Sequence, residues 1–319
     1  MPATVGLIAN PAAGRDIRRL TARASVVPNH EKAAIVRRVL HGLAATGVDR
    51  VRYLADRAGI VAAAVDGAAL PVAVEPLAYR ARGSAADSTE AARLLAAGGV
   101  GALVVLGGDG TNRAVAATCG DVPLVAISTG TNNVLPTMVD GTVAGMAAGL
   151  VAGGAVDIDR VSRRVKRIEV QADGLGDFAL IDAAACLDPF VGSRAIWDPS
   201  RVRALVLTRA APWAIGLSAI GGQLRPLGPA EPAGLYVELG PGPEILAAIA
   251  PGMVVRVPVA AWRLVGLAEP LTLTSGTRTV ALDGERELAV DGEVTASVSA
   301  SGPRVVDIRA TLEAAVRHG

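Results

Sequence analysis

The hexapeptide Gly107-Gly108-Asp109-Gly110-Thr111-Asn112 decides the fold class, and it directly follows an apolar run at residues 102–106. Such a run is typical of a strand that is buried on both faces of a parallel sheet. Residues 111–118 are expected to form a helix. In α/β folds, ligands bind where a strand ends and the next helix begins. The glycines let the backbone approach a ligand, and the free N–H groups and the helix dipole favour phosphate.

Asp109 is the acidic residue of this turn. An unpaired carboxylate would repel a phosphate group, so we expect Asp109 to face a Mg²⁺ ion or a hydroxyl nucleophile. The alternative is purely structural: a tight strand-to-helix turn in which Asp109 serves as a cap. Glycine-rich turns alone are weak signals and do not decide between the two.

Two further polar turns strengthen the phosphate interpretation. Ser128-Thr129-Gly130-Thr131-Asn132-Asn133 follows the apolar run at residues 123–127, and Asn10-Pro11-Ala12-Ala13-Gly14 follows the run at residues 5–9. Because parallel strands end at the same edge of a sheet, we expect the three turns to lie together. Together they predict a nucleotide pocket.

The chain divides into two halves of different pattern. In the first half strands alternate with helices: Asn29 is the expected N-cap of a helix over residues 30–45, a strand covers residues 50–54, and Asp87 or Ser88 caps a helix over residues 90–97. This alternation predicts an α/β domain, Rossmann-like with a mostly parallel sheet, over residues 1–157.

The second half contains short strand-like runs, among them residues 178–182, 236–239 and 253–258. They are separated by Asp-Gly turns such as Asp173-Gly174, Asp283-Gly284 and Asp291-Gly292. This pattern predicts a β-rich sandwich domain over residues 158–299. Residues 300–319, with an apolar run and a final helical segment, could return to the first domain.

Composition excludes several classes of protein. With 319 residues, 51% of them hydrophobic, the chain is long enough for two packed domains and is not disordered. A net charge of +1 without a long basic run argues against nucleic-acid binding. Two cysteines are too few for a disulfide framework and lie outside any metal-ligand spacing. Two of the 31 basic residues are lysine, Lys32 and Lys166, a bias that we attribute to genome composition.

No membrane segment is expected either. The longest charge-free stretches are interrupted by glycine or proline and fall short of the ~20 apolar residues that a spanning helix needs. The first residues do not follow the pattern of a secretory leader. We therefore expect a cytoplasmic protein that takes a small-molecule substrate.

The three turns resemble those of a known superfamily. Gly107–Asn112 resembles the signature shared by NAD kinases, diacylglycerol kinases and sphingosine kinases. Asn10-Pro11 with Gly14 resembles the lipid-kinase branch, and so does the turn at Thr129, except that Asn132 stands where those kinases have a second glycine. Leu282-Asp283-Gly284-Glu285 resembles the late Asp-Gly-Glu turn of the superfamily, with Asp291-Gly292-Glu293 as a rival match.

A closer resemblance covers nearly the whole chain. Six blocks are similar to the acetoin-catabolism protein X family, whose members are described as ATP-NAD kinase-like: residues 10–19, 29–32, 35–40, 104–112, 121–133 and 190–197. The resemblance implies an NAD kinase-like two-domain architecture with the active site in the cleft between the domains. By analogy it also implies a homo-oligomer, a dimer or a tetramer.

The resemblance implies an ATP-dependent kinase that uses Mg²⁺, and it assigns roles to residues. Asp109 orients or deprotonates the acceptor hydroxyl, directly or by holding Mg²⁺. The acceptor is contacted by Asp182, Asp283 and Glu285. The nucleotide and its phosphates are bound by Asn10, Gly107, Gly108, Gly110, Thr111, Asn112, Thr129, Gly130, Thr131 and Asn132.

Two departures bear on the acceptor. NAD kinases carry an Asn-Glu pair where this chain has Ile181-Asp182, and they carry a hydroxyl-rich block where this chain has residues 208–216. A site that recognises its substrate by hydrogen bonds loses discrimination when those partners are missing. These departures argue against NAD, and we expect the acceptor to be either NAD or a different metabolite, one linked to acetoin catabolism. A lipid kinase of the diacylglycerol type and a non-catalytic nucleotide-binding regulator remain as alternatives.

Overall fold

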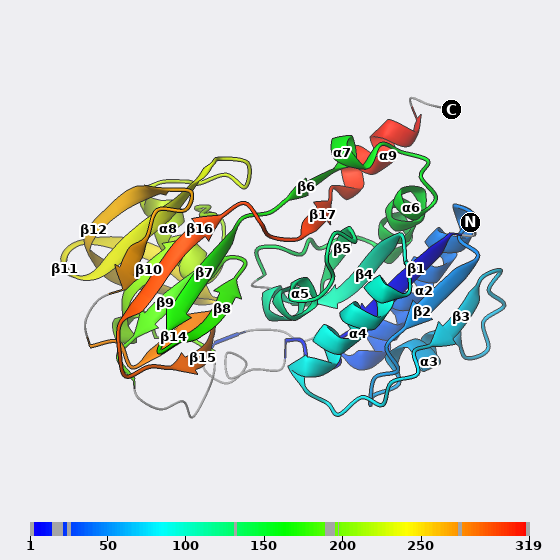
Figure 1. The fold of residues 1–319 in the computed structure, drawn as a ribbon, viewed down its shortest axis with the longest axis horizontal. Coiled ribbons are helices and arrows are strands. Elements are labelled where there is room, and N and C mark those ends of the chain that lie inside the picture. Colours follow the sequence, from blue (N-terminus) through cyan, green and yellow to red (C-terminus); the bar gives the residue numbers. More distant parts are fainter. Residues whose placement is uncertain are drawn as a thin grey trace.

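The computed structural model describes residues 3–14, 22–23, 27–130, 133–188, 195–196, 198–273 and 276–316. An α/β part and a β-rich part lie side by side (Figure 1). The paired strands β6 (Ser162–Arg164) and β17 (Arg304–Val306) run between them. The predicted fold class is thereby confirmed.

The α/β part is built on a seven-stranded sheet of order β3-β2-β1-β4-β5-β17-β6. All neighbouring pairs are parallel except β17 and β6. Residues from both halves of the chain therefore share this sheet. Its strands are β1 (Thr4–Ala9), β2 (Arg50–Tyr53), β3 (Ala73–Pro76), β4 (Ala102–Gly107), β5 (Leu124–Ser128), β6 (Ser162–Arg164) and β17 (Arg304–Val306).

The register of the central strands places the three polar turns at one edge. Ala9 of β1 pairs with Leu106 of β4, and Gly107 of β4 pairs with Ser128 of β5. Every residue of β4 and β5 is buried, as the apolar runs predict. The expectation that these three strands end together is confirmed.

Helices cover both faces of this sheet. On one face α2 (Asn29–Ala45), α3 (Ile60–Val65) and α6 (Gly141–Ala152) enclose a core that includes Val36, Leu40 and Val104. On the other face α4 (Ala85–Ala97) and α5 (Asp109–Ala116) enclose Leu95, Val105 and Val115. The short α7 (Ile158–Val161) and the terminal α9 (Ile308–Val316) contact each other beside the β6–β17 pair.

Three helix starts differ from the sequence-based expectation, and α5 begins at Asp109 instead of residue 111. Asn29 is the first residue of α2 and not its cap, because the extended Pro28 occupies the N-cap position. Helix α4 begins at Ala85, where Ser84 is the N-cap and Asp87 completes a capping box. Asp87 is therefore the third helical residue, and its carboxylate turns back to the start of the helix.

The β-rich part consists of two antiparallel sheets. The six-stranded sheet has the order β12-β11-β10-β9-β14-β15, and the four-stranded sheet has the order β13-β16-β7-β8. The first sheet contains β9 (Asp182–Cys186), β10 (Val202–Leu207), β11 (Ala233–Ala250), β12 (Met253–Gly266), β14 (Thr279–Leu282) and β15 (Glu285–Ala289). The second contains β7 (Arg167–Ala172), β8 (Leu175–Ala179), β13 (Leu271–Leu273) and β16 (Val294–Ser299).

Strand β10 shows how the two layers are packed. Ala204 and Val206 point into the core between the sheets, whereas Leu205 and Leu207 point to the opposite face. There they pack against α8 (Leu217–Leu224), and a short 3₁₀ helix, η1 (Pro199–Arg201), precedes the strand. This alternation is the period of two that a strand imposes on its side chains.

Strand boundaries in this part were predicted less well than strand existence. The runs at residues 236–239 and 253–258 are parts of the long strands β11 and β12, and the run at residues 178–182 is divided between β8 and β9. Strand β10 was not predicted. Within the described part of the chain, no helix is both long and apolar enough to span a membrane.

Candidate active site

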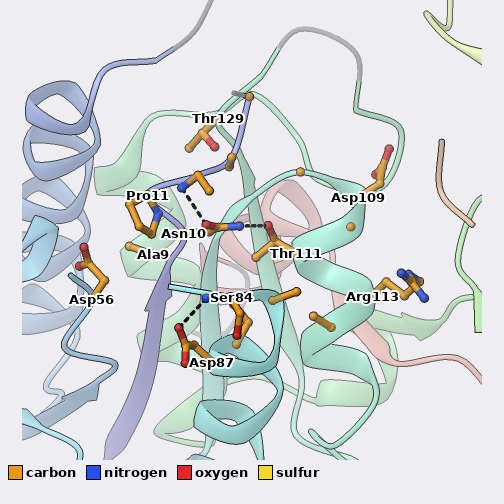
Figure 2. Close-up of a pocket in the computed structure, with 18 of the residues that line it drawn as sticks. Ala9, Asn10, Pro11, Asp56, Ser84, Asp87, Asp109, Thr111, Arg113 and Thr129 are labelled. Carbon is orange, nitrogen blue, oxygen red and sulfur yellow. Dashed lines mark hydrogen bonds between the residues drawn. The ribbon is translucent and has the colours of Figure 1, made fainter. Parts of the chain in front are cut away.

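The turn after β1 and the start of α5 are joined by hydrogen bonds. The Asn10 side chain donates from Nδ2 to Thr111 Oγ1 over 2.9 Å, and its Oδ1 accepts the Ala12 N–H at 2.9 Å (Figure 2). The Asn10 N–H also donates to the Leu106 carbonyl group at 3.0 Å. Two turns that the sequence only placed on one sheet edge are therefore in direct contact.

A cavity of about 340 Å³ lies against these turns. All three polar turns contribute to its wall, together with Asp56 after β2, the start of α4, and Leu282, Asp283 and Glu285 from the β-rich part. The cavity thus lies between the two parts of the protein. Its volume is at the lower end of the range usual for small-molecule sites.

The glycines of the hexapeptide serve two different purposes. A Cβ atom at Gly107 would lie 2.5 Å from Thr111 Oγ1, and one at Gly108 would lie 2.7 Å from Asn133 Oδ1. Gly107 is therefore required for packing, because a Cβ atom there would also lie 2.5 Å from Thr111 Cβ. At Gly108 the atom in the way is the end of the Asn133 side chain, which can move aside. A Cβ atom at Gly110 would meet nothing within 4 Å. Because Gly110 lines the cavity, its missing side chain leaves room for a ligand.

Asp109 is buried, and its carboxylate binds main-chain N–H groups. It accepts hydrogen bonds from Val134 at 2.9 Å and from Leu135 at 2.8 Å. It therefore fixes the segment that follows the β5 turn, and it does not cap α5, because Gly108 occupies the N-cap position without a side-chain cap. Arg209 supplies positive charge nearby: it donates to the Val134 carbonyl group, and burial lowers its pKa while the charge of Asp109 opposes that shift. Asp109 also lines the cavity, so structural and chemical roles are compatible.

Two buried polar atoms near the turns have no hydrogen-bond partner among the described residues: Thr129 Oγ1 and Asn112 Oδ1. Both residues are fully buried, and Thr129 lines the cavity. Asn112 is not part of the cavity wall, and its Nδ2 donates to the Gly108 carbonyl group at 2.9 Å. Gly130 lines the cavity next to Thr129, whereas Thr131 and Asn132 lie outside the described residues.

The carboxylates of Asp182 and Asp283, two of the predicted acceptor residues, each accept backbone N–H groups from beside the other residue. The Asp283 carboxylate accepts the N–H groups of Leu180 at 3.0 Å and Ile181 at 2.7 Å, and Asp182 Oδ1 accepts the Gly284 N–H at 2.9 Å. Asp283 and Glu285 line the cavity, whereas Asp182 is not part of its wall. Asp182 therefore supports the turn that carries the other two.

Asp283 is the most perturbed acid near the cavity. Complete burial and the negative charge of Asp109 raise its pKa to about 7, against the opposing effects of backbone N–H groups and of Arg113. Arg113 Nε lies 3.8 Å from Asp283 Oδ2, and Arg113 Nη1 lies 3.2 Å from Asp177 Oδ2. The guanidinium group of α5 thus connects the hexapeptide helix to the β-rich part.

Two acids at the other end of the cavity were not predicted as site residues from the sequence. Asp56 and Asp87 lie on the side away from Asp109 (Figure 2). Burial raises the pKa of Asp56, and N–H groups of Ile60 and Ala58 oppose this. Burial would also raise the pKa of Asp87, but the N–H groups at residues 82–84 and the Tyr79 hydroxyl group outweigh it and hold that pKa below its usual value. Asp56 could have been anticipated, because it follows a predicted strand.

The carboxylates around the cavity could hold Mg²⁺ only together with the phosphates of a bound substrate. Among the described residues, no group of three or more His, Cys, Asp or Glu side chains is arranged to hold a metal ion. Mg²⁺ usually binds through one or two carboxylates together with substrate phosphates and water. Asp109 in the cavity wall satisfies that requirement.

Comparison with known proteins agrees with this fold. Residues 5–155 match the ATP-NAD kinase N-terminal domain, and residues 166–302 match the Acetoin catabolism protein X C-terminal domain. The fold and the three polar turns after β1, β4 and β5 therefore define a kinase-like protein with an N-terminal domain of the NAD kinase type.

The particular family follows from a relative of nearly the same length. The chain is 40% identical to Acetoin catabolism protein X of Cupriavidus necator over 333 positions, which cover 98% of this chain and 92% of that protein. The chain belongs to the acetoin catabolism protein X family. Two solved structures from Bacillus anthracis str. Sterne, provisionally described as diacylglycerol kinases, cover 95% of this chain and 96% of their own at 14% identity, with TM-scores of 0.45 and 0.46.

Proposed function

We propose that this protein is an ATP-dependent kinase that transfers the terminal phosphoryl group to a hydroxyl group of a small molecule. The observation that carries the proposal is the convergence of the Asn10, Gly108 and Thr129 turns on one cavity. The fully buried Thr129 hydroxyl group, which lacks a partner among the described residues, supports it, because buried polar atoms are normally satisfied.

The two ends of the cavity differ in charge and suggest how ATP lies in it. The N–H groups of Gly108, Gly110 and Thr111 belong to the start of α5, where the helix dipole favours phosphate. Asp56 and Asp87 at the other end would repel phosphate. A carboxylate after the second strand of a Rossmann-like sheet is suited to ribose hydroxyl groups. We therefore assign the nucleoside to the end near Asp56.

Asp109 is the group that we assign to the acceptor hydroxyl. As the acceptor oxygen forms its bond to the γ-phosphorus, the bond between that phosphorus and the β–γ bridging oxygen breaks, and ADP leaves. The hydroxyl proton passes to the Asp109 carboxylate. Val134 and Leu135 hold this carboxylate by two N–H groups, so its position does not depend on the substrate. Transfers of this kind depend mainly on positioning and charge neutralisation.

As the alternative to direct proton transfer, Mg²⁺ would be held by Asp109 together with the ATP phosphates, and when bound it neutralises their charge. Arg113 adds a fixed positive charge in the cavity wall, beside Asp283. This cation offsets part of the negative charge that Asp109 and Asp283 bring to the same region.

The acceptor approaches from the β-rich part, which contributes Asp283 and Glu285 to the wall. We propose NAD or a metabolite linked to acetoin catabolism as the acceptor, and we propose separately that the protein is a cytoplasmic homo-oligomer. A lipid acceptor and a purely nucleotide-sensing protein are the competing outcomes of the assay.

The test is transfer of label from Mg-[γ-³²P]ATP to three acceptor samples: NAD, diacylglycerol in mixed micelles, and a pool of small metabolites. We expect a labelled product with NAD or the metabolite pool, and its loss in Asp109→Asn. Labelled lipid would instead support the lipid kinase. Nucleotide binding without transfer to any acceptor would contradict both kinase assignments.

A further inference from the structure

Lys32 lies behind the Asn10 turn and is one of the largest fully buried side chains of the protein. Its Nζ donates hydrogen bonds to three main-chain carbonyl groups of that turn: Asn10 at 3.0 Å, Pro11 at 3.2 Å and Ala13 at 3.2 Å. These residues line the cavity on their other side. The ammonium group is therefore separated from the cavity by a single layer of backbone.

The choice of lysine at this position is informative because lysine is so rare in the chain. The other lysine, Lys166, is also buried, and its Nζ donates to the carbonyl groups of Gly228, Glu231 and Ala233 at 3.3, 2.7 and 2.6 Å. An ammonium group has three donors on a compact centre, whereas a guanidinium group is planar and larger. Genome composition accounts for the many arginines, but the geometry accounts for the two lysines.

A buried ammonium group is costly unless its surroundings compensate it. The first turn of α2, where Lys32 lies, adds a further cost because the helix dipole disfavours a cation there. The three carbonyl groups of the turn supply part of the compensation. The conformation of the turn and the charge of Lys32 thus depend on each other.

The contact with Ala13 also sets the direction of the next N–H group. The described peptide bonds include no cis bond, and in a trans peptide the C=O and N–H groups point in opposite directions. Since the Ala13 carbonyl group points at Lys32, the Gly14 N–H points away from it. Gly14 lines the cavity and has a φ of 79°, a left-handed conformation that favours glycine.

We propose that Lys32 is a positioning residue for the phosphate site, which holds the turn at residues 10–14 so that the Gly14 N–H faces a phosphate oxygen. This inference rests on the proposed nucleotide function and assigns that site a residue outside the three turns. The ammonium group also places a positive charge directly behind the turn. Because the charge is buried, salt screens it less than a surface charge.

The rarity of lysine makes a direct test possible in the unmodified protein. With ¹³C-labelled lysine, the ¹³Cε–¹Hε region of an NMR spectrum contains two lysine signals from the chain, and the single variants Lys32→Met and Lys166→Met assign them. Titration with Mg-ATP is expected to shift the Lys32 signal saturably and to leave the Lys166 signal in place. Equal movement of both signals, or of Lys166 alone, would overturn the proposal.

The same two variants form a matched pair, since each removes a buried lysine that binds three carbonyl groups. Lys32→Met is expected to weaken Mg-ATP binding by about tenfold or more, the scale of a lost charged hydrogen bond. Lys166→Met should bind Mg-ATP like the wild type even where its melting temperature falls equally. Unchanged Mg-ATP affinity in a folded Lys32→Met variant would contradict the role. Should that variant not fold, the wild-type titration still decides, with the signals assigned by Lys166→Met.

Failure of this inference can be told apart from failure of the proposed function. Hydrogen exchange of the peptide covering residues 5–14 is measured without nucleotide in both variants. Faster exchange in Lys32→Met than in Lys166→Met would support the positioning of the turn, even if the wild type bound no nucleotide and the proposed function failed. Equal exchange in the two variants would overturn the positioning role, whatever the protein binds.

Discussion

The Asn10 amide group donates a 2.9 Å hydrogen bond to the Thr111 hydroxyl group, although the two residues are 101 positions apart. The bond joins the turn after β1 to the first turn of α5. It also orients Asn10 so that its oxygen accepts the Ala12 N–H. One side chain thereby stabilises two of the three turns around the cavity.

We expect Asn10 and Thr111 to be coupled in nucleotide binding. Asn10→Ala and Thr111→Val each remove the shared bond, so the double variant should lose less Mg-ATP affinity than the sum of the two single losses. The difference should be about 0.5–3 kcal/mol, the range for residues in one hydrogen-bond network. Calorimetric titration of the four proteins gives this coupling directly. Strictly additive losses would show that the two turns act independently.

Gly107→Ala should lower the free energy of unfolding, whereas Gly110→Ala should leave it unchanged or raise it. A methyl group at Gly107 collides with Thr111, so the free energy of unfolding should fall by about 1–3 kcal/mol. A methyl group at Gly110 meets open space within α5, so stability should be unchanged or rise by up to about 1 kcal/mol. The same methyl group would stand where the phosphates approach, so Mg-ATP affinity should drop. Denaturant unfolding and titration of both variants check this; an unaltered affinity in Gly110→Ala would place the phosphates elsewhere.

Substitutions at Asp109 should separate its chemical role from its structural one. Asp109→Ala leaves the N–H groups of Val134 and Leu135 without their acceptor and should destabilise the protein by about 1–3 kcal/mol. Asp109→Asn keeps a carbonyl oxygen for these donors and should be destabilised less. Both should lower kcat by about 10²- to 10⁴-fold, the usual contribution of a general base. Thermal unfolding measured beside steady-state kinetics tests the pair, and an active Asp109→Asn enzyme would refute the proton-transfer role.

The stability of the protein should depend on the protonation of Asp283. Burial and the charge of Asp109 raise its folded-state pKa from 3.8 to about 7, so the folded protein keeps a proton that the unfolded chain releases between these values. The contribution of Asp283 to stability is therefore complete below about pH 4 and is lost as the pH rises through about 7.

Asp283→Asn lacks this titration and serves as the reference. The free energy of unfolding of the wild type, relative to Asp283→Asn, should fall as the pH rises from 4 to 7, with a full amplitude on the order of 4 kcal/mol. Urea unfolding at several pH values measures it. A constant difference across this range would mean that Asp283 is ionised in the folded protein throughout.

The sequence predicted the sheet edge better than the side chains around it. The runs before Asn10, Gly107 and Ser128 are short and wholly apolar, and parallel strands of that kind end together, so the convergence of the turns follows from local pattern. The role of Asp87 did not follow, because the capping box that turns its carboxylate back depends on a helix start that the sequence placed several residues later.

The contacts between distant segments were also beyond the sequence. No local pattern distinguishes Arg113 from other arginines of the chain. Its approach to Asp177 and Asp283 depends on how the β-rich part packs against α5. Lys32 looked like part of a compositional bias, and only the fold brings the Asn10 turn to its ammonium group. Such contacts are set by packing between segments far apart in the chain, which carries no local periodic signal.

Calorimetric titration of Mg-ATP into the wild type and into Thr129→Val decides whether the three turns bind a nucleotide. The Thr129 hydroxyl group is buried in the cavity wall and has no partner within the described part of the chain, so its replacement by a methyl group should not lower the melting temperature. We expect saturable one-to-one binding by the wild type and weaker binding by Thr129→Val at equal stability. Absence of binding by the wild type, or equal affinity in the two proteins, would contradict a nucleotide site at these turns.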